Sequence, residues 1–349
     1  MTETYREYLT AYIKNNYIPK DALIENLPQD NEIDTSPSGE NYADAIFIYD
    51  INSGLRYTLF NQIPLKREFN ETQVRILKRL FDIIHEYYSF TNPNARLCIA
   101  AMQSWLSTKS RTFNASEYVK TLKMYNEEYD NAFPKLTGWK TCQGSESHYR
   151  GYPCSLWLLF HTLTVSEYVK TLKSHKFENL HEVIYTMRDY ITNFFSCTDC
   201  AKHFGQMAAT LEDEIIYPNS SVLWLWAAHN RANKRLAGDQ TEDPAHPKVQ
   251  FPTIQMCPNC YIDSKFDNAS VLEFLVNRYT AENFADLSTS KPPTPTIPGE
   301  QRWPTIFLDR NDISLCLIIY VSVSFVLLTI CFVLNFRKRT RDLRSMLLP

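Results

Sequence analysis

The chain has 349 residues, and its 36 Lys and Arg against 39 Asp and Glu give a formal net charge of −3. This near balance excludes a nucleic-acid-binding protein that relies on a large positive charge, so no nucleic-acid partner is expected. Hydrophobic residues make up 44% and aromatic residues 13% of the chain, which excludes collagen-like and generally disordered proteins. The length of the chain favours two globular domains and a tail.

Residues 1–41 are predicted to be an N-terminal segment and linker that precedes the folded body. A polar stretch at residues 28–40 marks its boundary. Residues 1–20 contain no apolar core of the kind that a signal peptide requires.

The body of the chain is predicted to be mostly helical because apolar residues recur with a 3.6-residue period. We expect two helical domains that meet near Leu136, one over residues 42–135 and one over residues 136–286. Asn70 or Thr72 is a candidate cap for the first helix, Ser220 or Ser221 for the sixth, and Gly238 for a helix C-terminus. The predicted helices span residues 72–88, 94–106, 154–172, 180–195, 197–211, 222–236 and 269–279.

The octapeptide SEYVKTLK occurs twice, at residues 116–123 and 166–173. Two copies are too few for a solenoid. The repeat indicates either a duplicated helical unit or a coincidence on two exposed helix surfaces.

Six of the nine cysteines fall in short pairs, namely Cys142 with Cys154, Cys197 with Cys200, and Cys257 with Cys260. Three interpretations remain open: a zinc site formed by the two C-x-x-C pairs, structural disulfides, and a redox-active pair. The gap between the two C-x-x-C pairs would be unusually wide for a zinc site, so no metal is expected. A disulfide between Cys142 and Cys154 would close a loop ahead of a helix.

The pair Cys197 and Cys200 favours redox chemistry because it opens a predicted helix. Unpaired N–H groups and the positive end of the helix dipole stabilise a thiolate at that position. A dithiol that is oxidised by O₂ also needs a cofactor that can accept two electrons.

Polar and aromatic side chains on three predicted helices could surround such a cofactor. Trp157 and His161 share one face of their helix, and Cys200 and His203 share another. On a third helix, four residues fall within roughly 100° of arc. This stripe suits a planar aromatic ligand with polar edges better than a dry core; its members are Trp226, His229, Asn230 and Asn233.

The C-terminal part predicts a membrane anchor. Residues 287–312 form a Pro-rich stalk, and residues 313–334 form an uncharged run of 22, long enough to span a bilayer as a helix. The basic tail, residues 335–349, is expected in the cytoplasm by the positive-inside rule. We therefore expect a single-pass membrane protein of the secretory pathway, in the Golgi or at the cell surface. Its catalytic body would be lumenal or extracellular, where four N-x-S/T sequons could be glycosylated.

The start of the chain does not fit a complete secretory product, because no signal peptide precedes the body. We expect the C-terminal part of a longer precursor, or an isoform without its leader.

Five sequence blocks resemble the quiescin sulfhydryl oxidases. They are GWKTCQGSESHYRGYPCSLWLLFHTLTV from residue 138, FFSCTDCAKHF from 194, PNSSVLWLWAAHNRANKRLAG from 218, DPAHPKVQFP from 243, and CPNC from 257. A looser similarity extends back to about residue 42. The resemblance implies an all-α fold: an Erv-type four-helix bundle plus a short fifth helix, preceded by a helix-rich Erv-like domain and followed by one transmembrane helix.

The same resemblance implies FAD as cofactor and assigns roles to the cysteines. Cys200 would lie against the flavin and Cys197 would exchange with substrate, while Cys142 and Cys154 would be structural and Cys257 and Cys260 a distal pair. Phe251 stands where many family members have Trp, which keeps a ring but loses an N–H donor. The implied flavin contacts are Arg150, Trp157, His161, Asp199, His203, Trp226, His229, Asn230, Asn233, Lys248 and Phe251.

The implied activity is oxidation of dithiols or reduced proteins, with O₂ converted to H₂O₂. The family also carries an upstream thioredoxin-like domain, which is not found in these residues. Two alternatives stay open: a membrane-tethered helical binding module whose disulfides are only structural, and a fragment without function of its own.

Overall fold

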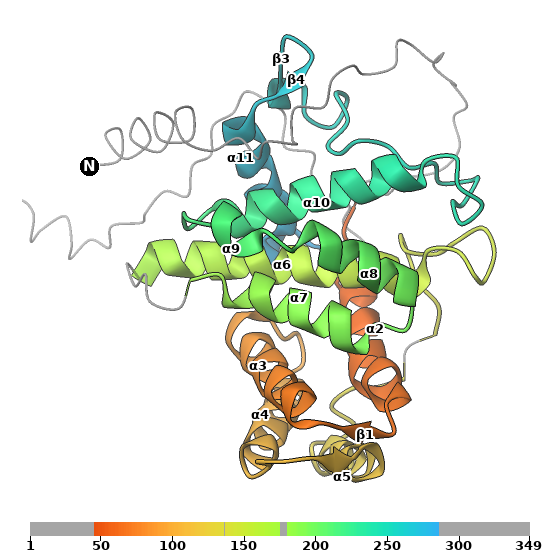
Figure 1. Cartoon of the computed structure of the whole chain (residues 1–349), viewed down its shortest axis with the longest axis vertical. Helices are drawn as coiled ribbons and strands as arrows, with labels where there is room; N and C mark the ends of the chain where they lie inside the picture. The colour runs from red at the N-terminus through yellow and green to blue at the C-terminus, as the bar shows by residue number, and fades with distance from the viewer. Residues whose placement is uncertain (1–44, 136, 175–179, 286–349) are drawn as a thin grey trace, which may run out of the picture. The chain divides into compact units, whose positions relative to one another are not determined.

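The computed structural model describes residues 45–135, 137–174 and 180–285. These residues belong to one compact unit (Figure 1). The predicted N-terminal segment, stalk, membrane span and cytoplasmic tail all lie outside the described residues. Among the helices that are described, none combines the length and the apolarity that crossing a membrane requires.

The first region is a group of helices with one short β-ladder. Helix α2 runs on without a break through a π-helical turn, η1, into a 3₁₀ turn, η2, and strands β1 and β2 pair antiparallel. The bounds are α2 (Ile48–Tyr57), η1 (Thr58–Gln62), η2 (Ile63–Leu65), β1 (Glu68–Phe69), α3 (Glu71–Tyr87), α4 (Pro93–Ser107), β2 (Phe113–Asn114) and α5 (Ala115–Glu128).

The second region contains the longest helix, α6, and a two-stranded hairpin, β3 with β4. The bounds are α6 (Gly151–Ser174), α7 (Glu182–Phe194), α8 (Thr198–Met207), α9 (Leu211–Glu214), α10 (Ser220–Leu236), η3 (Pro258–Cys260), β3 (Tyr261–Ile262), β4 (Lys265–Phe266), α11 (Asn268–Tyr279) and η4 (Ala281–Asn283).

Each helix that the periodicity predicts is present, with ends shifted by a few residues. Asn70 caps α3 through a capping box, in which its side chain and that of Gln73 bond each other's backbone N–H. The capping prediction for α10 is wrong, because Asn219 occupies the N-cap position and Ser220 is already helical. Gly238 follows the last helical turn at φ +74°, as a C-terminal glycine should.

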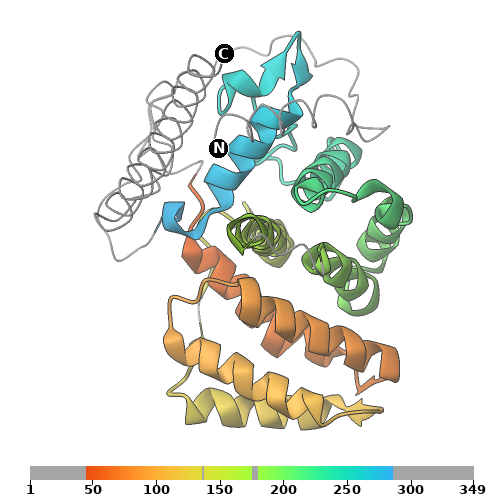
Figure 2. The ribbon, with the colours of Figure 1, turned by 90° about the vertical axis from the view of Figure 1, so that its left-hand side faces the viewer.

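Helix α6 is the centre of the packing, and α2, α3, α7, α10 and α11 all contact it. Figure 2, which looks nearly along α6, shows these helices arranged around it. The crossing of α2 and α6 is close: a Cβ on Gly54 would lie 1.8 Å from Ser155 Oγ. One continuous core of buried apolar side chains therefore joins the two regions.

Both copies of the octapeptide are helical, in α5 and α6, and neither copy lies wholly on an exposed helix surface. Tyr118 and Tyr168 are both buried. The glutamates differ, because Glu117 is exposed whereas only 3% of Glu167 is accessible. Identical local sequence therefore meets different surroundings in the two helices.

Candidate active site

Cys197 and Cys200 form a disulfide at the start of α8. Cys197 is the N-cap of this helix, and its Sγ accepts the backbone N–H of Cys200 at 3.2 Å. Cys197 is half-buried and Cys200 is exposed. The helix N-terminus thus places a thiolate-stabilising N–H directly on Cys197, as the sequence predicts.

The other two pairs are also disulfides, Cys142 with Cys154 and Cys257 with Cys260. Each C-x-x-C pair is closed on itself, so the four sulfurs do not combine into one thiolate site. The zinc interpretation is therefore wrong for these pairs.

Gln62 supports the loop that carries the redox pair. Its side-chain amide donates to the carbonyl of Phe194 at 2.6 Å, and its Oε1 accepts the hydroxyl of Ser196 at 3.2 Å. Gln62 is 1% exposed. The first region therefore holds Phe194 and Ser196 in the segment that leads into Cys197.

Trp157, His229 and Phe204 form a group of packed rings at helix α8, called the aromatic wall below. Trp157 and His229 stack with ring centroids 4.1 Å apart and planes within 3°. The ring of Phe204, one turn after Cys200, meets Trp157 edge-on at 6.2 Å. The structure thus brings Trp157 of α6 and His229 of α10 together next to the redox helix.

His161 extends this wall on its other side. Its Nε2 lies 3.2 Å from Nδ1 of His229, and its ring stacks on Tyr279 at 4.7 Å. Burial, together with His229 and Arg278, lowers the pKa of His161 well below its usual value. Burial and Lys248 lower the pKa of His229 to about 3. Both rings are therefore neutral at physiological pH.

Three residues of the stripe on α10 bond the segment 249–251. The side chain of Asn230 bonds both backbone groups of Phe251, donating at 2.7 Å and accepting at 2.8 Å. Trp226 Nε1 also donates to the carbonyl of Phe251, and Asn233 donates to that of Val249 at 2.9 Å. These three polar groups hold the segment 249–251, and His229 is the residue of the stripe that joins the aromatic wall.

Arg150 and Lys248 form a basic edge near the Cys142–Cys154 disulfide. Arg150 donates to the carbonyl of Thr141, and Lys248 is anchored by its backbone N–H to Glu242. Burial lowers the pKa of Arg150, although Asp243 and Asp50 oppose this shift. Burial and then Arg150 lower the pKa of Lys248. The two positive groups therefore crowd each other, which favours an anion between them.

Asp199 and His203, also predicted as contacts, lie on α8 as an exposed and a half-buried residue. Phe251 packs against Phe274 at 5.6 Å and lies under the guanidinium of Arg278 at 5.2 Å. Asp199 and His203 take part in none of the interactions described above for the aromatic wall.

The residues present suit a large, planar, anionic cofactor such as FAD. Several buried donors and acceptors around the wall have no hydrogen-bond partner among the described residues, and a cofactor with polar edges would satisfy them. These orphaned atoms are His161 Nδ1, Arg150 Nε, Arg231 Nε and Nη2, Gln250 Oε1 and Arg278 Nε.

Sequence reasoning missed several residues that shape this site. Gln62 and Tyr279 contribute from outside the predicted faces, and Asp50 binds the loop before Cys142. These three give no local signal, because their partners lie far away in the chain.

Comparison with known proteins agrees with this arrangement. A model of the FAD-dependent sulfhydryl oxidase family matches residues 43–145, and a model of the Erv1/Alr family matches residues 154–252. Sulfhydryl oxidase 1 of Cavia porcellus is 36% identical over 71% of this chain, and sulfhydryl oxidase 2 of Homo sapiens is 36% identical over 69%.

A solved structure, the sulfhydryl oxidase fragment of human QSOX1, superposes with a TM-score of 0.63 at 33% identity. The match covers 70% of this chain and 99% of that fragment. The chain spans 41% and 36% of the length of the two curated relatives. With the helix bundle, the aromatic wall and the disulfide that opens α8 all in place, the chain belongs to the quiescin sulfhydryl oxidase family.

Proposed function

We propose that this protein oxidises dithiols to disulfides with FAD as cofactor and O₂ as electron acceptor, which is released as H₂O₂. The observation that carries the proposal is the Cys197–Cys200 disulfide at the start of α8, one turn before Phe204 of the aromatic wall. Small dithiols and reduced proteins, thioredoxin-like domains among them, have the chemistry that this disulfide accepts.

FAD, when bound, supplies the capacity to take two electrons from thiols and pass them to O₂. The residues that would hold it are Trp157, His161 and His229 along the aromatic wall and Arg150 and Lys248 at the basic edge. The neutral imidazoles add no positive charge to the wall, so the positive charge for an anionic cofactor lies at that edge.

The protein's own cysteines carry out the exchange with substrate. A substrate thiolate attacks Cys197 Sγ, the bond between Cys197 and Cys200 breaks, and Cys200 leaves as a thiolate. The second substrate thiol loses its proton and attacks the mixed disulfide, which frees Cys197. The substrate is then a disulfide, and Cys197 and Cys200 have gained its two electrons.

Replacement of Cys200 by Ser tests this assignment. The variant should bind FAD with its absorption near 450 nm intact, and O₂ consumption with dithiothreitol should fall to background because no internal disulfide can form. The matched control is Cys98→Ala, which removes the buried free thiol of α4 and should keep its turnover. Undiminished O₂ consumption by the Cys200 variant would overturn the assignment.

We further propose that the protein is a single-pass membrane protein of the secretory pathway, in the Golgi or at the cell surface, with its catalytic body lumenal or extracellular. The support comes from the sequence: an uncharged run of 22 residues followed by a basic tail. Protease added to sealed Golgi vesicles should remove a tag after residue 349 and spare the body. Digestion of the body and protection of the tag would reverse this topology.

A further inference from the structure

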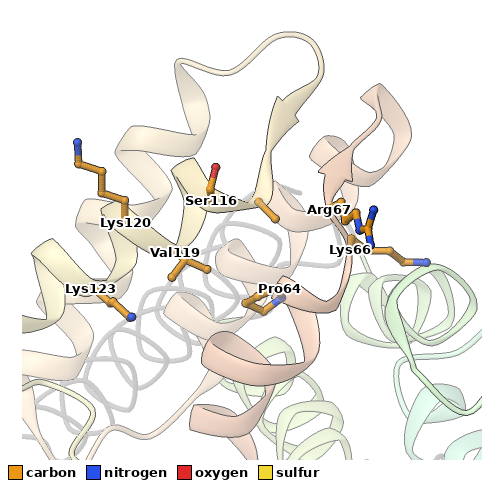
Figure 3. Close-up of a pocket in the computed structure, with 8 residues that line it drawn as sticks. Pro64, Lys66, Arg67, Ser116, Val119, Lys120 and Lys123 are labelled. Atoms are coloured by element: carbon orange, nitrogen blue, oxygen red, sulfur yellow. The ribbon is translucent and has the colours of Figure 1, made fainter.

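A groove lined by basic side chains lies between the segment after η2 and the first turns of α5. Its volume is about 660 Å³. Figure 3 shows Lys120 and Lys123 projecting from α5 on one side and Lys66 and Arg67 on the other. The lining residues are Pro64, Lys66, Arg67, Ala115, Ser116, Val119, Lys120 and Lys123.

Half of these lining residues are positively charged and none is acidic. Arg67, Lys120 and Lys123 are exposed and Lys66 is half-buried. Within the described part of the chain, none of the four forms an ion pair. By contrast, Lys109, at the other end of the loop before α5, is paired with Glu117. The groove therefore has positive charge that no ion pair among the described residues neutralises.

Gln62 connects the segment that lines this groove to the loop before the redox disulfide. Gln62, which bonds Phe194 and Ser196 beside Cys197, is only two residues before Pro64. Lys66 is four residues from Gln62, so their Cα atoms are at most about 14 Å apart. The ring of Phe69 also lies 6.0 Å from that of Phe194. An extended chain that leaves Cys197 would thus reach the groove within several residues.

We propose that the groove binds an acidic segment of polypeptide substrates whose dithiol reacts at Cys197. The inference rests on the proposed oxidase function and adds a substrate preference to it. The cations stand on opposite sides of an open groove, which suits an extended chain with several carboxylates better than one compact anion. Exposed ion pairs are individually weak and screened by salt, so the preference should depend on ionic strength.

The test uses three synthetic peptides that share a Cys-Gly-Gly-Cys dithiol and differ in a six-residue flank of Glu and Gly, Ser and Gly, or Lys and Gly. At ~0.02 M salt the Glu peptide should have a KM about fivefold below that of the Ser peptide, and the difference should vanish near ~0.5 M. The Lys peptide should have the highest KM. The kcat values should be alike, because the chemistry at Cys197 is the same.

The double variant Lys66→Gln with Lys120→Gln should remove most of this difference while turnover of dithiothreitol is unchanged. The control, Lys135→Gln with Lys265→Gln, makes the same change in net charge at two exposed sites outside the groove and should keep the preference. Equal KM values for the three peptides, or equal effects of the two double variants, would overturn the proposal.

A lower KM for the Ser peptide after the groove is neutralised would also overturn it. That result would indicate that an acidic segment of the chain itself covers the groove, such as residues 21–44, which contain acidic but no basic residues. If the parent protein does not oxidise dithiothreitol, the oxidase function itself fails, which is a separate result.

Discussion

Asp50 is a buried carboxylate that holds the loop before the first disulfide. It is 0% exposed and accepts the backbone N–H groups of Lys140, Thr141 and Cys142 at 2.7 to 3.0 Å. The hydroxyl of Thr141 is a fourth donor, at 2.9 Å. Four donors converging on one carboxylate compensate for its burial.

Asp50→Asn should therefore be strongly destabilising for a change of so few atoms. The amide turns an NH₂ group toward backbone donors, which leaves buried N–H groups unpaired at a cost of about 2–4 kcal/mol in the free energy of unfolding. Urea denaturation measures this cost. The control Asp189→Asn breaks partly exposed ion pairs with Arg79 and Arg188 and should cost under about 1 kcal/mol. Equal costs for the two variants would contradict the role of Asp50.

Sequence patterns identify such residues only when their partners are local. Cys197 and Cys200 could be predicted because the motif and its helix are contiguous. Asn230 shows the limit: its helical face could be predicted, but its partner, the backbone of Phe251, is 21 residues away. Asp50 bonds residues some 90 positions later, so no local pattern reveals it.

The continuous element formed by α2, η1 and η2 delivers Gln62 to the redox loop. We expect Gln62→Leu to slow reaction at Cys197, because the Phe194 carbonyl and the Ser196 hydroxyl lose the hydrogen bonds that hold them. If loss of these contacts raises the activation free energy by about 1 kcal/mol, kcat/KM for dithiothreitol should fall roughly fivefold. Stopped-flow reduction of the bound flavin by dithiothreitol measures this step directly.

The matched control is Gln103→Leu, which removes a hydrogen bond to Asp82 between α3 and α4 and should leave kcat/KM unchanged. FAD content should be normal in both variants. A Gln62 variant that reacts at the parent's rate would show that the loop is held by other contacts.

Helix α7 begins without a side-chain cap of its own, and Glu167 of α6 supplies one. A carboxylate oxygen of Glu167 accepts the N–H of Val183 at 3.2 Å. Burial is the main cause that raises the pKa of Glu167 to about 8, while the bond from Val183 opposes it. The folded protein therefore binds a proton on Glu167 more tightly than the unfolded chain does.

This raised pKa gives stability a defined pH dependence. Between the usual pKa of glutamate and about 8, only the folded state holds the proton, so its stability falls as pH rises, by at most about 1.4 kcal/mol per pH unit. Glu167→Gln should remove this slope and become more stable than the parent at pH near ~8. Urea denaturation across this range measures it, and parallel pH profiles for the two proteins would contradict the interpretation.

Most helices could be predicted, because their buried faces are apolar. Helix α2 was not, because its buried face contains Asp50, Ser53 and Gly54, which interrupt the apolar period. Those small and polar residues allow the close approach to α6 at Ser155. The small and polar residues that interrupt the apolar pattern of α2 are thus also the residues that let α2 pack against α6.

At the scale of the whole molecule, the two regions share one core. Leu80→Ala in α3 should cost about 2–4 kcal/mol, because Leu80 is 1% exposed. Helix α3 contributes nothing to the aromatic wall. Even so, the temperature of flavin release and the temperature at which helical circular dichroism is lost should fall together. The control Leu97→Ala, at a position 51% exposed in α4, should shift neither. Flavin release that stays at the parent's temperature would show that the regions unfold separately.

The Cys142–Cys154 disulfide joins the two stretches that the family models match, since Cys142 lies near the end of one, residues 43–145, and Cys154 begins the other. The loop between them is the exposed stretch that includes Ser145 to His148. A protease that cuts this loop would leave two chains covalently attached, which separate on a gel only after reduction. In a chimaera, replacing one stretch by a segment without the matching cysteine would leave the cysteine of the other stretch unpaired.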